Sequence, residues 1–106
     1  MYTTRSAPKD PGDEPPIRAR LILHKMSESR YGIPGHGRVL CRLWRMEGTH
    51  PRLHPSVYAV EMGGMGERRF CLIGREEVTA RRIFALLVRH TVTPCGLRDV
   101  LEELIE

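Results

Sequence analysis

The sequence predicts a single small α+β domain, in which a mostly antiparallel sheet of about four strands is covered by two C-terminal amphipathic helices. Between residues 17 and 73, segments with apolar residues at alternate positions are separated by Gly- and Pro-rich stretches, a pattern typical of strands and turns. After Gly74, apolar residues recur with the 3.6-residue period of a helix that buries one face. Strands followed by helices are typical of α+β folds.

The length of the chain sets its domain organisation. With 106 residues it has room for one domain but not for a second. Residues 1–16 contain four prolines among small and charged residues, so we expect a disordered tail there and a single domain over residues 17–106. The chain begins without the apolar stretch of a secretory signal, and no apolar run approaches the roughly 20 residues that span a bilayer. We therefore expect a cytoplasmic protein that does not enter a membrane.

Four segments carry the alternating pattern of half-buried strands. In the first, Ile17 and Ala19 alternate with Arg18 and Arg20, so one face of the strand is apolar and the other is basic. In the second, both faces are partly apolar and the pattern leaves its burial open. The expected strands span residues 17–23, 38–46, 57–62 and 68–73.

Turn residues separate these strands. Residues 27–37 contain three glycines and one proline, and we expect turns there with at most a short strand at Tyr31 and Ile33. Residues 47–55 contain two prolines, which cannot donate hydrogen bonds in a ladder, and are expected to form a loop. The glycines at positions 63, 64 and 66 supply the positive φ angles that a hairpin needs.

Two helices are expected after the last strand. Glu76 and Glu77 open the first and Arg89 and His90 close it, which complements the helix dipole. Thr93 and Pro94 provide an N-cap and a first-turn proline for the second. Ten residues on the two apolar stripes are predicted to be core: Ala80, Ile83, Phe84, Leu87, Val88, Leu97, Val100, Leu101, Leu104 and Ile105.

Charge is distributed unevenly along the chain. The net charge is +4, but residues 17–52 carry eight basic and two acidic side chains, whereas residues 76–106 carry four basic and six acidic ones. The strand half is therefore basic and the helical half acidic. The chain also has 15 Arg, two Lys and neither Asn nor Gln, a bias expected of GC-rich coding DNA. Part of the arginine content thus has an explanation that involves no function.

The basic strands suggest a nucleic-acid-binding surface. Arg42 and Trp44 share a face of the second strand, so a guanidinium could meet a phosphate while the indole stacks on a base. The alternative is a solvated sheet face with Trp44 in the core. The candidate nucleic-acid-binding residues are Arg18, Arg20, Arg38, Arg42, Trp44 and Arg45.

No motif supports catalysis. The three cysteines are far apart and not arranged as CxxC pairs, so they indicate neither a disulfide framework nor a zinc site. His50 and His54 have a spacing found in some zinc sites, but the other half of such a site is missing. The glycine runs do not match a phosphate-binding loop, and no nucleophile motif such as G-x-S-x-G occurs. We expect no catalytic residues, no metal and no cofactor.

The second helix offers the main candidate for protein contact. If its apolar stripe packs on the sheet, Asp99, Glu102 and Glu103 remain on its exposed side. We therefore expect a small non-enzymatic protein-interaction or regulatory module, with a nucleic-acid-binding module as the alternative. The sequence leaves the partner and the oligomeric state open.

About half of the chain, over residues 56–105, carries a moderately specific pattern. It consists of the segments SVYAVEM and RRFCLIG, an acidic helix start, and a closing segment with Pro94, Leu97, Asp99, Val100 and Glu102. These features resemble a group of short bacterial proteins catalogued as a domain of unknown function, in which a YGI-type strand and a closing segment like sPxhLxDvvEdfl occur. The chain departs from that pattern at Ala59, Cys95, Gly96, Glu103 and Leu104. The group has no assigned activity, so the resemblance implies a fold and not a function.

Overall fold

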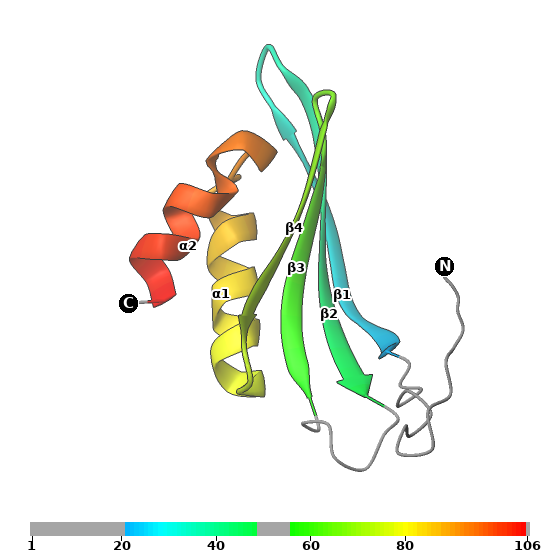
Figure 1. Cartoon of the computed structure of the whole chain (residues 1–106). Coiled ribbons are helices and arrows are strands. Elements are labelled where there is room, and N and C mark those ends of the chain that lie inside the picture. Colours follow the sequence, from blue (N-terminus) through cyan, green and yellow to red (C-terminus); the bar gives the residue numbers. More distant parts are fainter. Residues whose placement is uncertain (1–20, 49–55, 106) are drawn as a thin grey trace, which may run out of the picture.

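The computed structural model describes residues 21–48 and 56–105 of the chain. The described part is an antiparallel sheet followed by two helices, which confirms the predicted α+β class (Figure 1). The expected tail over residues 1–16 and the pair His50 and His54 lie outside the described residues. The elements are β1 (Leu21–Ile33), β2 (Gly37–Gly48), β3 (Val57–Gly64), β4 (Glu67–Gly74), α1 (Glu77–Arg89), the 3-10 turn η1 (Pro94–Gly96) and α2 (Leu97–Ile105).

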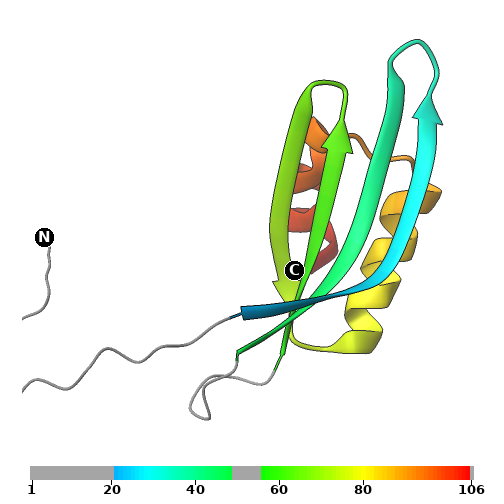
Figure 2. The ribbon, with the colours of Figure 1, turned by 90° about the vertical axis from the view of Figure 1, so that its right-hand side faces the viewer.

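The four strands form a meander in which each strand pairs with the next one in the sequence. The order is β1-β2-β3-β4 and every pairing is antiparallel, so β1 and β4 are the edges. Both helices lie against the same side of the sheet (Figures 1 and 2). The sheet therefore has a covered face beneath the helices and an open face on the other side. Within the described segments, no helix is long and apolar enough to cross a membrane.

β1 continues well beyond its expected end. Residues 27–33 were expected to lie in turns with at most a short strand at Tyr31 and Ile33, but they pair with β2 without interruption up to Ile33. The turn is confined to the following three residues, where the His36 amide donates to the Ile33 carbonyl at 2.9 Å. Serine and glycine disfavour strands on propensity, but the ladder with β2 and a bulge between Lys25 and Ser27 overrule that preference. The first strand of the sheet is thus 13 residues long.

The core lies between the covered face and the helices. Val39, Cys41 and Leu43 alternate along β2 and are at most 1% exposed. They meet a stripe of α1 that includes Leu87, which is fully buried. Of the ten predicted core residues, five are buried, Phe84, Val88 and Val100 pack partly against the core, and Leu104 and Ile105 are exposed.

The error at Leu104 and Ile105 has a simple cause. Their spacing in the sequence continues the apolar stripe of α2, but both residues lie in the last turn of the helix. Leu104 and Ile105 are 38% and 48% exposed there, so the core ends before this turn. The N-cap prediction for Thr93 also needs refinement. Thr93 precedes η1 and not α2 directly, and its hydroxyl makes no capping hydrogen bond but lies 3.5 Å from the Cys95 thiol.

The β3–β4 hairpin is closed by a tight turn. Met65 and Gly66 have φ angles of 56° and 77°, so the turn has two residues with left-handed backbone. Gly64 is also at positive φ, and a Cβ atom there would collide with the backbone carbonyl oxygen of Arg38 on β2. The predicted need for positive φ is therefore confirmed at positions 64 and 66, and not at 63.

Candidate interaction surface

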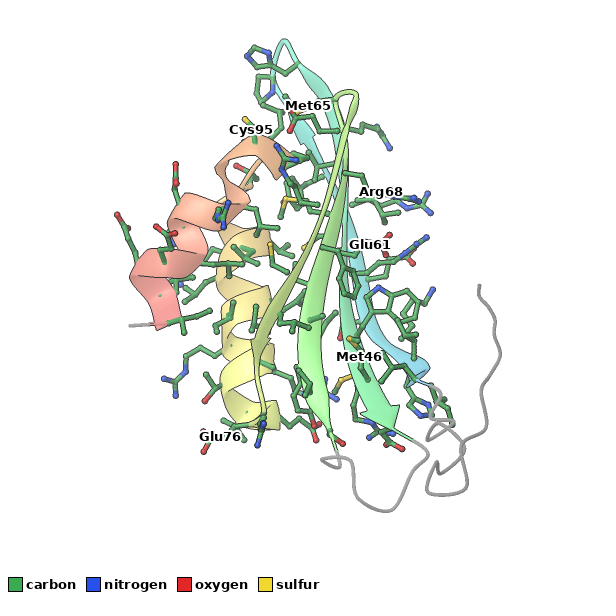
Figure 3. The ribbon with its side chains drawn as sticks, viewed as in Figure 1. Met46, Glu61, Met65, Arg68, Glu76 and Cys95 are labelled. Carbon is green, nitrogen blue, oxygen red and sulfur yellow. The ribbon has the colours of Figure 1, made fainter. Side chains whose placement is uncertain are left out.

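The open face is defined by strand register. Val39, Cys41 and Leu43 of β2 point to the covered face, so the residues that alternate with them point the other way. Cross-strand pairs carry this assignment to the other strands, for example Arg42 with Glu28 and with Glu61. In Figure 3, Met46, Glu61 and Arg68 all point away from the helices. The open face comprises Leu21, Leu23, Lys25, Glu28, Arg30, Arg38, Leu40, Arg42, Trp44, Met46, Val57, Ala59, Glu61, Arg68, Phe70 and Leu72.

Part of the open face is apolar and exposed. Phe70 and Leu72 on β4 are 48% and 60% exposed, and Leu23 on β1 is 46% exposed. Between the edge strands, Ala59 pairs with both Trp44 and Leu72 and is fully buried although no described helix covers it. The larger side chains on either side of Ala59 therefore shield it. Grouped exposed apolar residues of this kind mark interaction surfaces more often than single ones do.

The rest of the open face is an ionic network, and Glu28 is one of its two centres. Its Oε1 accepts hydrogen bonds from Lys25 Nζ at 2.9 Å and from Arg42 Nε at 3.1 Å, and its Oε2 lies 3.4 Å from Arg30 Nη2. The hydrogen bonds from Lys25 and Arg42 lower the pKa of Glu28 from its ordinary value of 4.5 to about 2. The carboxylate therefore stays ionised far below neutral pH.

Glu61 on β3 is the second centre. Its Oε1 accepts a hydrogen bond from the Trp44 indole Nε1 at 2.9 Å and lies 3.5 Å from Arg42 Nη1. Its Oε2 lies 3.6 Å from Arg68 Nε. Arg42 thus joins the two carboxylates across β2, and the network fixes the orientation of Trp44 as well as of the cations.

Cations outnumber carboxylates on the open face. Among the described residues of this face there are two carboxylates, Glu28 and Glu61, against five cations, which gives an excess of three positive charges. The cations are Lys25, Arg30, Arg38, Arg42 and Arg68. The Arg68 side chain is 78% exposed, so its ion pair with Glu61 leaves most of the guanidinium in solvent. Arg30 and Arg38 line a shallow hollow of about 370 Å³ together with Leu40 and Gly63.

The structure brings together only part of the predicted nucleic-acid-binding set. Arg38, Arg42 and Trp44 share the open face as expected. Arg45 does not belong with them, because it alternates with Trp44 onto the opposite face, where its Nε lies 3.1 Å from Glu47 Oε2. Arg18 and Arg20 lie outside the described residues.

Sequence reasoning did not identify most of the open-face residues, among them three cations and one aromatic side chain. Lys25 and Arg30 were missed because β1 was ended too early, although Arg30 alternates with Tyr31 in a pattern that could have revealed the strand. Arg68 and Phe70 on β4 were not among the candidate residues. In the register of β4, Arg68 pairs with Gly63 and Phe70 pairs with Glu61 of β3.

The predicted protein-contact residues all lie exposed on α2. Asp99, Glu102 and Glu103 are separated from the core, but Arg98 stands among them, so the surface is not uniformly acidic. Glu102 and Arg98 line a groove of about 530 Å³ between α2 and the edge strand β4. The remaining lining residues are Cys71, Leu72, Leu101 and Ile105.

The three thiols lie in different environments. Cys41 is buried in the core, and this burial raises the pKa of its thiol to about 12. Cys71 on β4 is partly buried and Cys95 in η1 is exposed. All three are free. In the described part of the chain, no three His, Cys, Asp or Glu side chains are grouped so that they could hold a metal ion.

Comparison of the chain with models of protein families, with curated proteins and with solved structures finds no match. The resemblance of residues 56–105 to a domain of unknown function therefore stays a prediction.

Proposed function

We propose that the protein is a non-enzymatic binding module, and that it contacts a protein partner through the open face of its sheet. The observation that supports this proposal is that the open face has no described cover and yet exposes Leu23, Phe70 and Leu72 beside an ordered ionic network. Exposed apolar side chains that gather on one face of a protein mark interaction surfaces more often than isolated ones do.

The chemistry of the open face indicates what kind of partner it fits. Its apolar side chains favour an apolar contact, and its excess of three positive charges favours an acidic rim. The half-buried Trp44, which Glu61 holds in place by a hydrogen bond, is a rigid amphipathic side chain of the type that dominates binding energy. The proposed partner is therefore a protein that presents apolar residues among carboxylates.

This proposal differs from the expectation based on sequence alone. The sequence placed the contact on Asp99, Glu102 and Glu103 of α2, whereas the larger exposed apolar surface lies on the open face. Of these three acidic residues, Glu102 lines the groove between α2 and β4.

The test is affinity capture from the source cell with a matched pair of variants. Leu23→Glu places a carboxylate on the open face, and Val78→Glu makes the same change at an exposed position of α1. We expect the wild-type chain and Val78→Glu to recover the same protein after nuclease treatment, and Leu23→Glu to lose it. Equal recovery by both variants would remove the open face from consideration.

The cation excess supports a second candidate function, the binding of single-stranded nucleic acid. Arg30, Arg38 and Arg68 could contact phosphates while Trp44 and Phe70 stack on bases. Replacing the three arginines by glutamine should then lower the slope of log affinity against log salt by roughly 2, as expected for three lost phosphate contacts. Fluorescence anisotropy with a labelled oligonucleotide measures this slope. No binding by the wild-type chain at low salt would exclude the candidate.

A further inference from the structure

The edge strand β4 is charged in its first part and uncharged in its second part. Its first three residues, Glu67, Arg68 and Arg69, are charged, which is how proteins discourage strands from pairing at a sheet edge. The next four, Phe70–Ile73, carry no charge, and Phe70 and Leu72 among them are 48% and 60% exposed. Within residues 21–48 and 56–105, the second half of β4 is therefore an edge whose outward backbone donors and acceptors have no partner.

A groove runs beside this unprotected half. It lies between β4 and α2, and its apolar floor includes Leu72, Leu101 and Ile105. Arg98 and Glu102 line it one helical turn apart, and neither forms an ion pair with any described residue. The groove thus presents one unpaired positive and one unpaired negative charge on a single helix.

We propose that β4 pairs antiparallel with β4 of a second copy of this chain, around a two-fold axis at Cys71. The pairing joins two four-stranded sheets into one continuous sheet of eight strands. It goes beyond the proposed function, because it concerns a second copy of this chain and not a different protein. Both proposals use the exposed side chains of Phe70 and Leu72, but only the pairing of copies uses the backbone edge of β4 and the charges of α2.

The hairpin turn restricts the register. In a hairpin with a two-residue turn, the flanking pair Gly64 and Glu67 is hydrogen-bonded, and bonded and non-bonded pairs alternate from there. Arg68, Phe70 and Leu72 are therefore the residues whose backbone groups point away from β3 to the free edge. A second β4 must use these three residues for its hydrogen bonds.

Side-chain matching selects the axis at Cys71. With this register Phe70 of each copy lies opposite Leu72 of the other, so two exposed apolar side chains cover two others on the open face. Arg68 then lies opposite Gly74 of the second copy and avoids apolar neighbours. An axis at Phe70 would instead place Arg68 opposite Leu72, which buries less apolar surface and desolvates a charge.

The charges of α2 are complementary under the same symmetry. α2 and β4 run in the same direction (Figure 1). Cys71 and Arg98 line the groove described above, which also contains Leu72, and they line a second hollow that contains Arg69. The two hollows thus meet at Cys71 and Arg98, and Glu102 lies one helical turn further along α2. The two-fold axis makes the two α2 helices antiparallel, so Arg98 of each copy approaches Glu102 of the other, which forms two ion pairs.

The test exploits this symmetry by exchanging charges. Arg98→Glu gives a groove with two carboxylates and Glu102→Arg gives one with two guanidiniums, so each variant repels its own copy. We expect each to weaken self-association by at least about tenfold, as measured by sedimentation velocity over a range of concentrations. An equal mixture of the two should recover the dimer, and so should the double variant that carries both changes. Glu103→Arg is the matched control, since it makes the same change of charge outside the groove.

A covalent trap tests the register. In the proposed pairing the Cys71 residues of the two copies form a non-hydrogen-bonded pair, in which Cα atoms are roughly 4.5 Å apart. This separation suits a disulfide. Mild oxidation of the Cys95→Ser chain by diamide, which takes up the two protons and two electrons released, should join two chains through Cys71. The chain with both Cys71→Ser and Cys95→Ser should stay uncrosslinked.

Three outcomes would overturn the proposal. These are a wild-type chain that remains monomeric at every concentration, a mixture of the two charge variants that does not associate, and a dimer that forms no Cys71 crosslink. None of them bears on the capture experiment with Leu23→Glu, because Leu23 lies on β1 at the other edge of the sheet.

Discussion

The two faces of this sheet are built from the same strands but have different physical roles. On β2, the alternate residues Cys41 and Leu43 are fully buried beneath the helices, while Arg42 and Trp44 belong to an ionic network on the open face. Burial of apolar area stabilises the fold on the covered face. On the open face, exposed apolar side chains contribute little to folding. The difference indicates that substitutions on the open face can change binding while the fold persists.

Truncation of one leucine on each face tests this separation most strongly. Leu43→Ala leaves a cavity in the fully buried core and should lower the free energy of unfolding by about 2–5 kcal/mol. Leu23→Ala, on the open face, should lower it by less than about 1 kcal/mol. Urea denaturation followed by circular dichroism measures both. Similar losses for the two variants would mean that the open face also belongs to the stabilising core.

Substitution of a glycine on the covered face is expected to give the next largest loss of stability. Gly64→Ala forces a residue with a Cβ atom to adopt a φ of 140° and to meet the Arg38 carbonyl, which should cost more than about 2 kcal/mol. Gly74→Ala is the control, because its φ of 127° imposes a similar backbone strain but the space around it is open, so it should cost less than Gly64→Ala. Thermal unfolding of both variants distinguishes contact from backbone strain, and equal costs would contradict the close approach of β3 to β2.

Tyr31 tests how the sheet edge is joined to the helix layer. Its hydroxyl donates a hydrogen bond of 2.6 Å to the Val92 carbonyl, which lies between α1 and η1. Tyr31→Phe should destabilise the fold by about 1 kcal/mol, because a buried carbonyl loses its partner while the ring remains. Chemical denaturation gives the value. Hydrogen exchange at the end of α1 should rise in the same variant, and unchanged exchange there would show that the hydroxyl does not restrain the helix layer.

The smallest expected change in stability comes from a substitution on the open face, and its size depends on pH. The pKa of Glu28 is about 2 in the folded chain and near 4.5 when its partners are absent, so the unfolded chain binds more protons between these values. The stabilisation is complete above pH 4.5 and is lost as the pH falls toward 2. The difference in unfolding free energy between the wild-type chain and Glu28→Gln should therefore shrink over this range. A difference that stays constant down to pH 2 would contradict the network.

Periodicity predicted the helices better than it predicted the strands. The stripe that contains Ala80, Ile83 and Leu87 located α1 to within a residue, since a helix needs only local spacing to show which side is buried. β1 was cut short because the three glycines and one proline of residues 27–37 indicated turns, whereas the pairing of Ser27 and Ser29 with β2 depends on residues more than ten positions away.

The candidate site was predicted only where it depended on one strand. Arg42 and Trp44 were placed together because side chains two positions apart share a face. The same rule, applied strictly, would have moved Arg45 to the other face. Glu28 and Glu61, which neutralise much of the basic surface, come from β1 and β3, and their proximity follows from sheet register that the sequence does not encode locally.

The position of the chain's single tryptophan makes the open face observable by fluorescence. Trp44 lies on that face with its indole nitrogen bonded to Glu61, and not in the core. Its emission should therefore shift when a partner excludes water from the open face, while substitutions beneath the helices leave the folded spectrum unchanged. Occupancy of the open face can thus be followed by intrinsic fluorescence, without attaching a label to the protein.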